Sequence, residues 1–161
     1  MGRSPPLDGP SSGTYHRGRK RGGVGFAVVA AVVAAVGAVR RWRPSRVEVG
    51  GDSMTPTLEP GDWVLTVTPR RLHRGDVVVV DHPERAGFEM VKRITRLPGE
   101  VAPDGSLLGP ESYWVEGDNP TGSTDSRAFG SVTRDRVLAT AVLVYGPGPR
   151  WRIVRRGDAR G

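Results

Sequence analysis

Cysteine is absent from the 161 residues, and histidine occurs only three times. Without cysteine the chain has no disulfide, no thiol nucleophile and no cysteine-based metal site, whatever its compartment. His16, His73 and His82 are scattered and lack the spacing of metal ligands. The sequence therefore implies no metal site and no organic cofactor.

Positive charge is in excess, with 24 Lys and Arg against 17 Asp and Glu and a net charge of +7. Such a charge suits either nucleic acid or an anionic membrane surface. The basic residues lie on both sides of one apolar segment: Arg17, Arg19, Lys20 and Arg21 before it, and Arg40, Arg41, Arg43 and Arg46 after it. This arrangement is typical of a membrane span, so we predict contact with membrane lipid and no nucleic-acid partner; a nucleic-acid-binding arm is the alternative.

The N-terminal third divides into a tail and an apolar segment. Residues 1–21 are rich in Pro, Gly and Ser, so burial cannot offset the entropy of ordering, and we predict a disordered basic tail. Residues 22–39 carry no charge and, as a helix, would roughly cross a hydrocarbon core of ~30 Å, which predicts a transmembrane anchor. The alternative is a cleavable secretory signal, but the arginines directly after the segment disfavour processing. Nearly balanced flanking charge leaves the orientation open.

Residues 46–155 have the texture of a mostly β domain, with short β-branched runs separated by Gly, Pro and Asp. The dipeptides Asp104-Gly105, Pro60-Gly61 and Pro98-Gly99 predict turns. We expect a small barrel-like antiparallel β domain with one N-terminal transmembrane helix and a flexible tail at 156–161. The predicted strands are Val47–Val49, Trp63–Val67, Asp76–Val80, Phe88–Thr95, Tyr113–Glu116, Val137–Tyr145 and Trp151–Val154.

The first residues that suggest chemistry surround Ser53. Gly50 and Gly51 permit close backbone approach before it, and Pro56 fixes φ shortly after it. The serine is therefore expected on a stiff, narrow turn that presents both Oγ and a backbone N–H. An ordinary surface loop is the alternative.

The second candidate is Lys92. With the two-residue period of a strand, Phe88, Met90, Lys92 and Ile94 share one face. An amine among apolar neighbours loses hydration of its charged form, so its pKa falls toward neutrality, and a neutral amine can take the proton of a serine. Arg93 faces the other way and stays charged. In the alternative, Lys92 reaches out to water along the sheet.

A third cluster contains Asp118, Ser123, Asp125 and Arg127. Asp125 and Arg127 are spaced to form a local ion pair, and a neighbouring hydroxyl can hydrogen-bond an amine. For the two aspartates and Arg127 we expect structural support rather than direct chemistry.

Taken in order, the motifs resemble those of the signal peptidase I family over about residues 47–145: Ser53-Met54-x-Pro56, Arg74-Gly75-Asp76, Lys92-Arg93, Gly117-Asp118-Asn119 and Ser123-x-Asp125-Ser126-Arg127. The resemblance implies a membrane-bound serine endopeptidase with a β-rich catalytic domain on the outer face of the membrane, held by one or more N-terminal helices. With the one apolar segment of this chain, we expect a single-pass protein of the cell membrane. Ser53 falls on the nucleophile, Lys92 on its general base and Ser123 on the hydroxyl that orients the lysine. Asp125 and Arg127 fall on supporting positions.

The implied substrate is the signal peptide of an exported preprotein with an Ala-x-Ala pattern before the cut. A monomer is expected. Gly51 stands where some family members have an oxyanion-hole serine, so the hole would rest on backbone N–H groups, those of Ser53 or Gly51. The short stretch 101–112 resembles the compact relatives, some of which are dedicated maturation proteases acting on one partner. A non-enzymatic anchored β module is a further alternative.

Overall fold

The computed structural model describes residues 1, 23–42, 44–148 and 151–157. The predicted N-terminal tail, apart from Met1, and residues 158–161 of the predicted C-terminal tail lie outside the described residues. The chain forms two compact units, Met1–Val36 and Gly37–Gly161.

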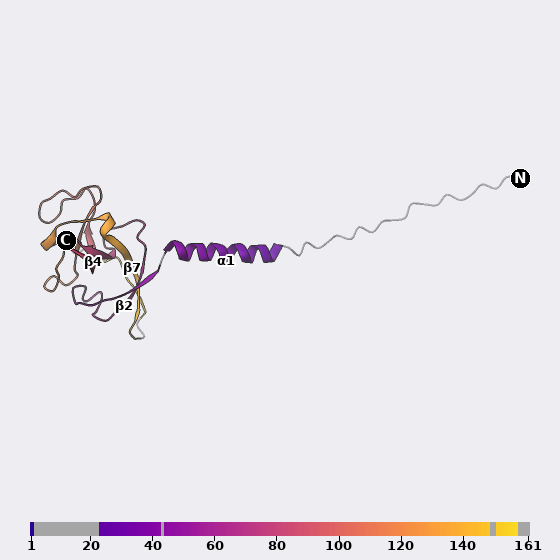
Figure 1. Cartoon of the computed structure of the whole chain (residues 1–161), viewed down its shortest axis with the longest axis horizontal. Helices are drawn as coiled ribbons and strands as arrows, with labels where there is room; N and C mark the ends of the chain where they lie inside the picture. Colours follow the sequence, from indigo (N-terminus) through magenta and orange to yellow (C-terminus); the bar gives the residue numbers. More distant parts are fainter. Residues whose placement is uncertain (2–22, 43, 149–150, 158–161) are drawn as a thin grey trace. The chain divides into compact units, whose positions relative to one another are not determined.

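Helix α1 spans Gly23–Trp42. It is drawn as the indigo to purple coiled ribbon in Figure 1. Alanine has the highest helix propensity of the residue types, and no proline interrupts the run, which favours an uninterrupted helix. Across the described part of the chain, no helix combines the length and the apolar character needed to cross a membrane.

The second unit is mostly antiparallel β-sheet, as the sequence predicts, and every strand pairing in it is antiparallel. Its strands run in the order β1-β2-β7-β3-β4-β5-β6, and β8 pairs with β7. Figure 1 labels β2, β4 and β7 within this unit. Among the described strands no pairing joins β1 to β6, so the sheet has two ends. The strands are β1 Ser45–Glu48, β2 Trp63–Val67, β3 Val77–His82, β4 Arg85–Arg96, β5 Ser112–Glu116, β6 Val132–Thr133, β7 Val137–Gly146 and β8 Arg152–Ile153.

Seven of these strands match the predicted ones to within a few residues. The sequence reading missed the two-residue β6 and two short helical turns, α2 at Ser126–Phe129 and the 3-10 turn η1 at Arg134–Arg136. The predicted hairpin turn at Gly105 is present, with φ of 85°. Elements of two to four residues carry too few positions for a period to be read from the sequence.

Strand β3 lies at the centre of the sheet and is buried on both faces. Val77 packs in one hydrophobic cluster with Val49, Met54 and Leu58. Val78 packs in a second cluster, which includes Met90, Ile94, Val115 and Val137. The two clusters hold the segment around Ser53 against one face of the sheet and the strand carrying Lys92 against its neighbours. The core therefore fixes both candidate catalytic segments.

Candidate active site

Ser53 lies in a turn between β1 and β2, which we call the Ser53 turn, residues 50–62. Two backbone hydrogen bonds close its base: Val49 donates to the carbonyl of Asp62 at 2.9 Å, and Gly61 donates to the carbonyl of Val49 at 2.7 Å. Met54 and Leu58 are fully buried and pin the turn to the core. Ser53 itself is only half-buried, so its hydroxyl can meet a substrate.

Lys92 extends from β4 toward the Ser53 turn and is only 3% exposed. Its Nζ donates hydrogen bonds to Ser53 Oγ at 2.9 Å and to Ser123 Oγ at 3.1 Å. Within the described residues no carboxylate forms a salt bridge with this amine. Lys92 is thus within hydrogen-bond reach of both serines, Ser53 and Ser123, which the sequence singled out in segments distant from it.

The environment of Lys92 favours the neutral amine. Burial lowers the pKa of Lys92, the negative charge of Asp125 raises it in part, and the positive charge of Arg127 lowers it. On β4, Lys92 stands between Met90 and Ile94, both buried, as the two-residue period predicts. Phe88 departs from that expectation, since 52% of its surface is exposed.

Ser123 connects the amine to an ion pair. Its hydroxyl donates to Asp125 Oδ2 at 2.8 Å, and Arg127 Nη2 lies 2.6 Å from the same oxygen. Burial works to raise the pKa of Asp125, but hydrogen bonds from Arg127, the Gly117 N–H and Ser123 outweigh it and lower the pKa to about 2. The carboxylate is therefore ionised at neutral pH. The predicted local ion pair of Asp125 and Arg127 is present.

Helix α2 explains why this ion pair forms. Asp125 is its N-cap, with the side chain accepting from the Arg127 N–H. Asp125 is itself fully buried, while the Arg127 side chain remains 41% exposed. A short cap thus holds a buried anion next to the serine that contacts Lys92.

Gly117 sits where the segments converge. A Cβ at this position would lie 2.5 Å from the carbonyl oxygen of Ser53, so no larger residue fits without a backbone shift. The neighbouring Asn119 N–H donates to that same carbonyl at 3.0 Å. The Gly117-Asp118-Asn119 motif therefore anchors the backbone of Ser53, a role that the spacing alone did not reveal.

A cavity of about 570 Å³ opens beside the hydroxyl of Ser53. The Ser53 turn lines one wall, including Gly51, which is exposed, and residues 88–92 of β4 line the other. Val79 and Met90 contribute apolar surface, while Glu48 and Glu89 contribute carboxylates. The serine thus borders a groove between two strand segments.

The sequence reading missed the environment of Arg93, which it placed on the opposite face from Lys92. Arg93 is buried at 5% exposure and forms a two-pronged pair with Asp118, Nε to Oδ1 at 2.7 Å and Nη2 to Oδ2 at 2.6 Å. It also donates to the hydroxyl of Thr57 at 3.2 Å. The available sign in the sequence was Val91, an apolar residue two positions before Arg93 and so on the same face of the strand. In the structure Val91 is half-buried and packs against the cluster that contains Met54 and Leu58.

The chain is similar to one family of peptidases and to several known members of it. The family model described as "Signal peptidase, peptidase S26" matches residues 22–103 and 101–146. Mitochondrial inner membrane protease subunit 2 of Saccharomyces cerevisiae is 32% identical over 122 residues, covering 65% of this chain and 69% of the relative. Subunit 1 of Xenopus tropicalis is 34% identical over 95 residues, covering 51% of this chain and 57% of the relative.

A plant relative extends the similarity. The mitochondrial ATP-independent inner membrane protease subunit 1a of Arabidopsis thaliana is 35% identical over 123 residues, covering 66% of this chain and 73% of the relative. The family model covers most of the β unit and all three segments that meet at Ser53. The chain therefore belongs to the signal peptidase family, peptidase S26.

Proposed function

We propose that the protein is a membrane-bound serine endopeptidase in which Ser53 is the nucleophile and Lys92 its general base. Membership of the family supports a serine-type peptidase. The observation that carries the residue assignment is the 2.9 Å contact from the buried Lys92 Nζ to Ser53 Oγ. Burial lowers the pKa of Lys92 and so favours the neutral amine that a base requires.

In the proposed reaction, neutral Lys92 takes the proton of Ser53 as Oγ attacks the scissile carbonyl. The lysine then returns that proton to the leaving amine, and the peptide bond breaks to leave an ester on Ser53. A water molecule, deprotonated by the same amine, then attacks the ester; the bond to Oγ breaks, the new carboxyl end is released, and Lys92 returns the proton to Ser53 Oγ. Backbone N–H groups of Ser53 or Gly51 are the proposed oxyanion donors. Ser123 holds the amine toward Ser53, and Asp125 with Arg127 holds Ser123.

The groove suits an extended peptide. Strand β4 pairs with β5 only from Arg93 to Arg96, so residues 85–92 have β3 on one side and, among the described strands, no partner on the other. An extended substrate can pair with this edge. Its first and third side chains before the cut then face the same way, which suits the Ala-x-Ala pattern of a preprotein signal peptide.

The proposed membrane setting is a single-pass anchor at segment 22–39, with the catalytic domain on the extracytoplasmic side of the cell membrane. It is argued from the uncharged sequence of that segment, since no helix among the described residues meets the requirements of a span. The relatives are named inner membrane protease subunits, which supports a membrane location. The word subunit in their names also favours an assembled enzyme over the predicted monomer.

The second candidate function is a dedicated maturation protease that acts on one specific partner. The similarity to inner membrane protease subunits favours it.

The test is cleavage of a peptide with an Ala-x-Ala site by the full chain in detergent. We expect Ser53→Ala and Lys92→Arg to lose activity, because arginine keeps the charge but does not deprotonate. Ser131→Ala and Lys20→Arg are matched controls; Ser131 is exposed in the β unit, and Lys20 is the chain's one other lysine. Undiminished turnover in Lys92→Arg would exclude Lys92 as the base.

A further inference from the structure

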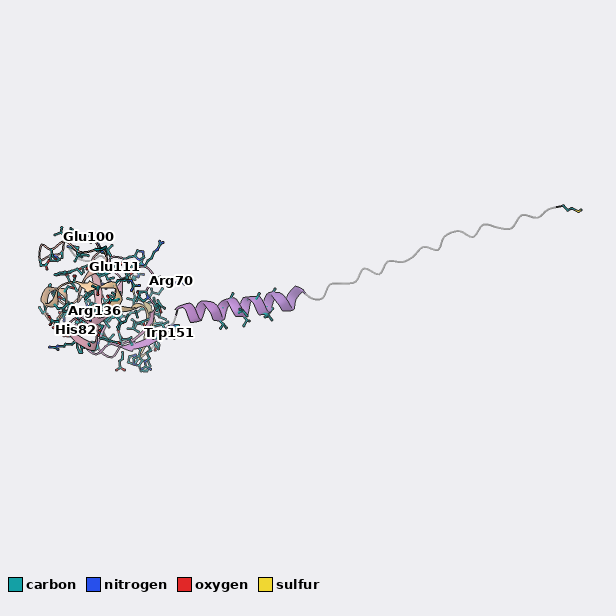
Figure 2. The ribbon with its side chains drawn as sticks, turned by 45° about the horizontal axis from the view of Figure 1, so that its top comes forward. Arg70, His82, Glu100, Glu111, Arg136 and Trp151 are labelled. Atoms are coloured by element: carbon teal, nitrogen blue, oxygen red, sulfur yellow. The ribbon has the colours of Figure 1, made fainter. Side chains whose placement is uncertain are left out.

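The C-terminal strap, residues 151–157, is bound to the β unit along its length. Strand β8 pairs with β7 in the register Val144↔Arg152, and the Val154 N–H donates to the carbonyl of Val142 at 3.0 Å. Trp151, which Figure 2 labels, begins the strap and is 72% exposed. Val154 packs against the cluster that contains Met54 and Leu58 of the Ser53 turn. The strap therefore contacts the hydrophobic base of the nucleophile segment.

Arg152 links the strap directly to the Ser53 turn at two points. Its Nη1 donates to the carbonyl of Thr57, and its Nη2 lies 2.6 Å from Asp62 Oδ2. The same Asp62 oxygen accepts the backbone N–H of Glu59 at 3.0 Å. One guanidinium thus ties together the C-terminal half of the turn, whose N-terminal half carries Ser53.

Thr57 is also where the turn meets the strand that carries the base. Arg93, the residue after Lys92, donates from Nη2 to the Thr57 hydroxyl at 3.2 Å. Its Nη1 donates to the backbone carbonyl of Arg155 in the strap at 3.3 Å. Arg152 holds the Thr57 carbonyl and Arg93 holds its hydroxyl, so the nucleophile turn, β4 and the strap meet at a single residue.

We propose that Arg152 is a positioning residue for the proposed peptidase: by holding Thr57 and Asp62, it sets the position of Ser53 Oγ relative to Lys92 Nζ. The inference rests on the proposed function. Arg152 lines a second cavity of about 260 Å³, beside Pro56 and Asp62, and none of the residues lining that cavity lines the groove at Ser53. A change at Arg152 should therefore lower kcat and leave the binding of substrate in the groove largely unchanged.

The experiment compares Arg152→Ala, Arg152→Lys and Arg155→Ala in the full chain in detergent, with kcat and KM measured on the Ala-x-Ala peptide well below each melting temperature. A misplacement of ~1 Å costs about 100-fold in rate, so we expect kcat of Arg152→Ala to fall about 10- to 100-fold with KM changed less than about 3-fold. A lysine has a single terminal nitrogen and lacks the two-pronged geometry that holds both acceptors. The kcat of Arg152→Lys should therefore lie between those of wild type and Arg152→Ala. Arg155 is the matched control, because it is exposed and contributes its backbone carbonyl.

A second readout does not depend on activity. The Leu58 N–H donates to the Met54 carbonyl at 2.8 Å within the turn, and we expect its hydrogen exchange to be about 10-fold faster or more in Arg152→Ala than in Arg155→Ala. Wild-type kcat in Arg152→Ala, or a raised KM with unchanged kcat, would overturn the inference alone. If wild type and Ser53→Ala are equally inactive, the proposed function fails. In that case, unchanged hydrogen exchange of the Leu58 N–H in Arg152→Ala would also refute the role of Arg152 in holding the Ser53 turn.

Discussion

Neutralising Asp125 or Arg127 should move the acid limb of the pH profile in opposite directions. Burial lowers the pKa of Lys92, the Asp125 carboxylate raises it and the Arg127 guanidinium lowers it. Asp125→Asn removes the charge that favours the ammonium form, so Lys92 becomes a free base at lower pH and the acid limb of kcat/KM shifts to lower pH. Arg127→Gln leaves the Asp125 charge uncompensated, so the acid limb shifts to higher pH.

The size of the effect follows from the hydrogen-bond chain. Lys92 Nζ lies 3.1 Å from Ser123 Oγ, which lies 2.8 Å from Asp125 Oδ2, so the two charges are at most about 6 Å apart. At an effective dielectric of about 20 they interact by roughly 3 kcal/mol, and at about 40 by half as much. At a fixed pH on the acid limb, this corresponds to about 10- to 100-fold more neutral amine in Asp125→Asn. The opposite change in Arg127→Gln should be smaller, because Asp125 has the larger influence on Lys92.

The assay is the initial rate of Ala-x-Ala peptide cleavage by the full chain from mildly acidic to alkaline pH, each variant normalised to its own alkaline plateau. Normalisation separates the position of the limb from any loss caused by a misplaced Ser123. Arg127→Gln is the milder variant, because the arginine side chain is 41% exposed. Shifts in the same direction, or two unmoved limbs with chemistry rate-limiting, would refute the assignment of Lys92 as the titrating base.

Two further predictions concern packing. Gly117→Ala should lower kcat by about 100-fold, because the new Cβ would lie 2.5 Å from the Ser53 backbone carbonyl, which cannot rotate away; wild-type kcat would contradict this placement. Asp118→Ala should cost about 3–5 kcal/mol of unfolding free energy in denaturant titration, since it leaves Arg93 buried without its anion. Glu48→Ala, in an exposed pair, should cost less than about 1 kcal/mol, and equal losses in the two variants would refute the distinction.

The sequence predicted most of the sheet because its strands have clear β-branched patterns and turn residues between them. It also predicted the meeting of Ser53, Lys92 and Ser123, through the order of motifs rather than through any local rule. It could not predict β6 or α2, which are too short to show a period.

The sequence also could not predict the ion pairs between residues that lie far apart in the chain. Arg93 and Asp118 are 25 residues apart, and Arg152 and Asp62 are 90 residues apart. An arginine on a strand can pair with any of many carboxylates, and only the folded topology selects one. The structural roles of Arg93 and Arg152 were therefore not visible in the sequence pattern, whereas Lys92 stood out because a lysine among apolar residues is uncommon.

The register of β4 determines which of its two cations faces Ser53. Val78 pairs with Lys92 and Val77 pairs with Arg93, so the two cations project to opposite faces of the sheet. Lys92 reaches Ser53 Oγ, while Arg93 reaches Asp118 and Thr57. A slip of one residue would exchange them and present to Ser53 a guanidinium that does not deprotonate. The pairing of β4 with β3 therefore underlies the proposed chemistry, because this register turns the deprotonatable amine of Lys92 toward Ser53 and the guanidinium of Arg93 toward Asp118.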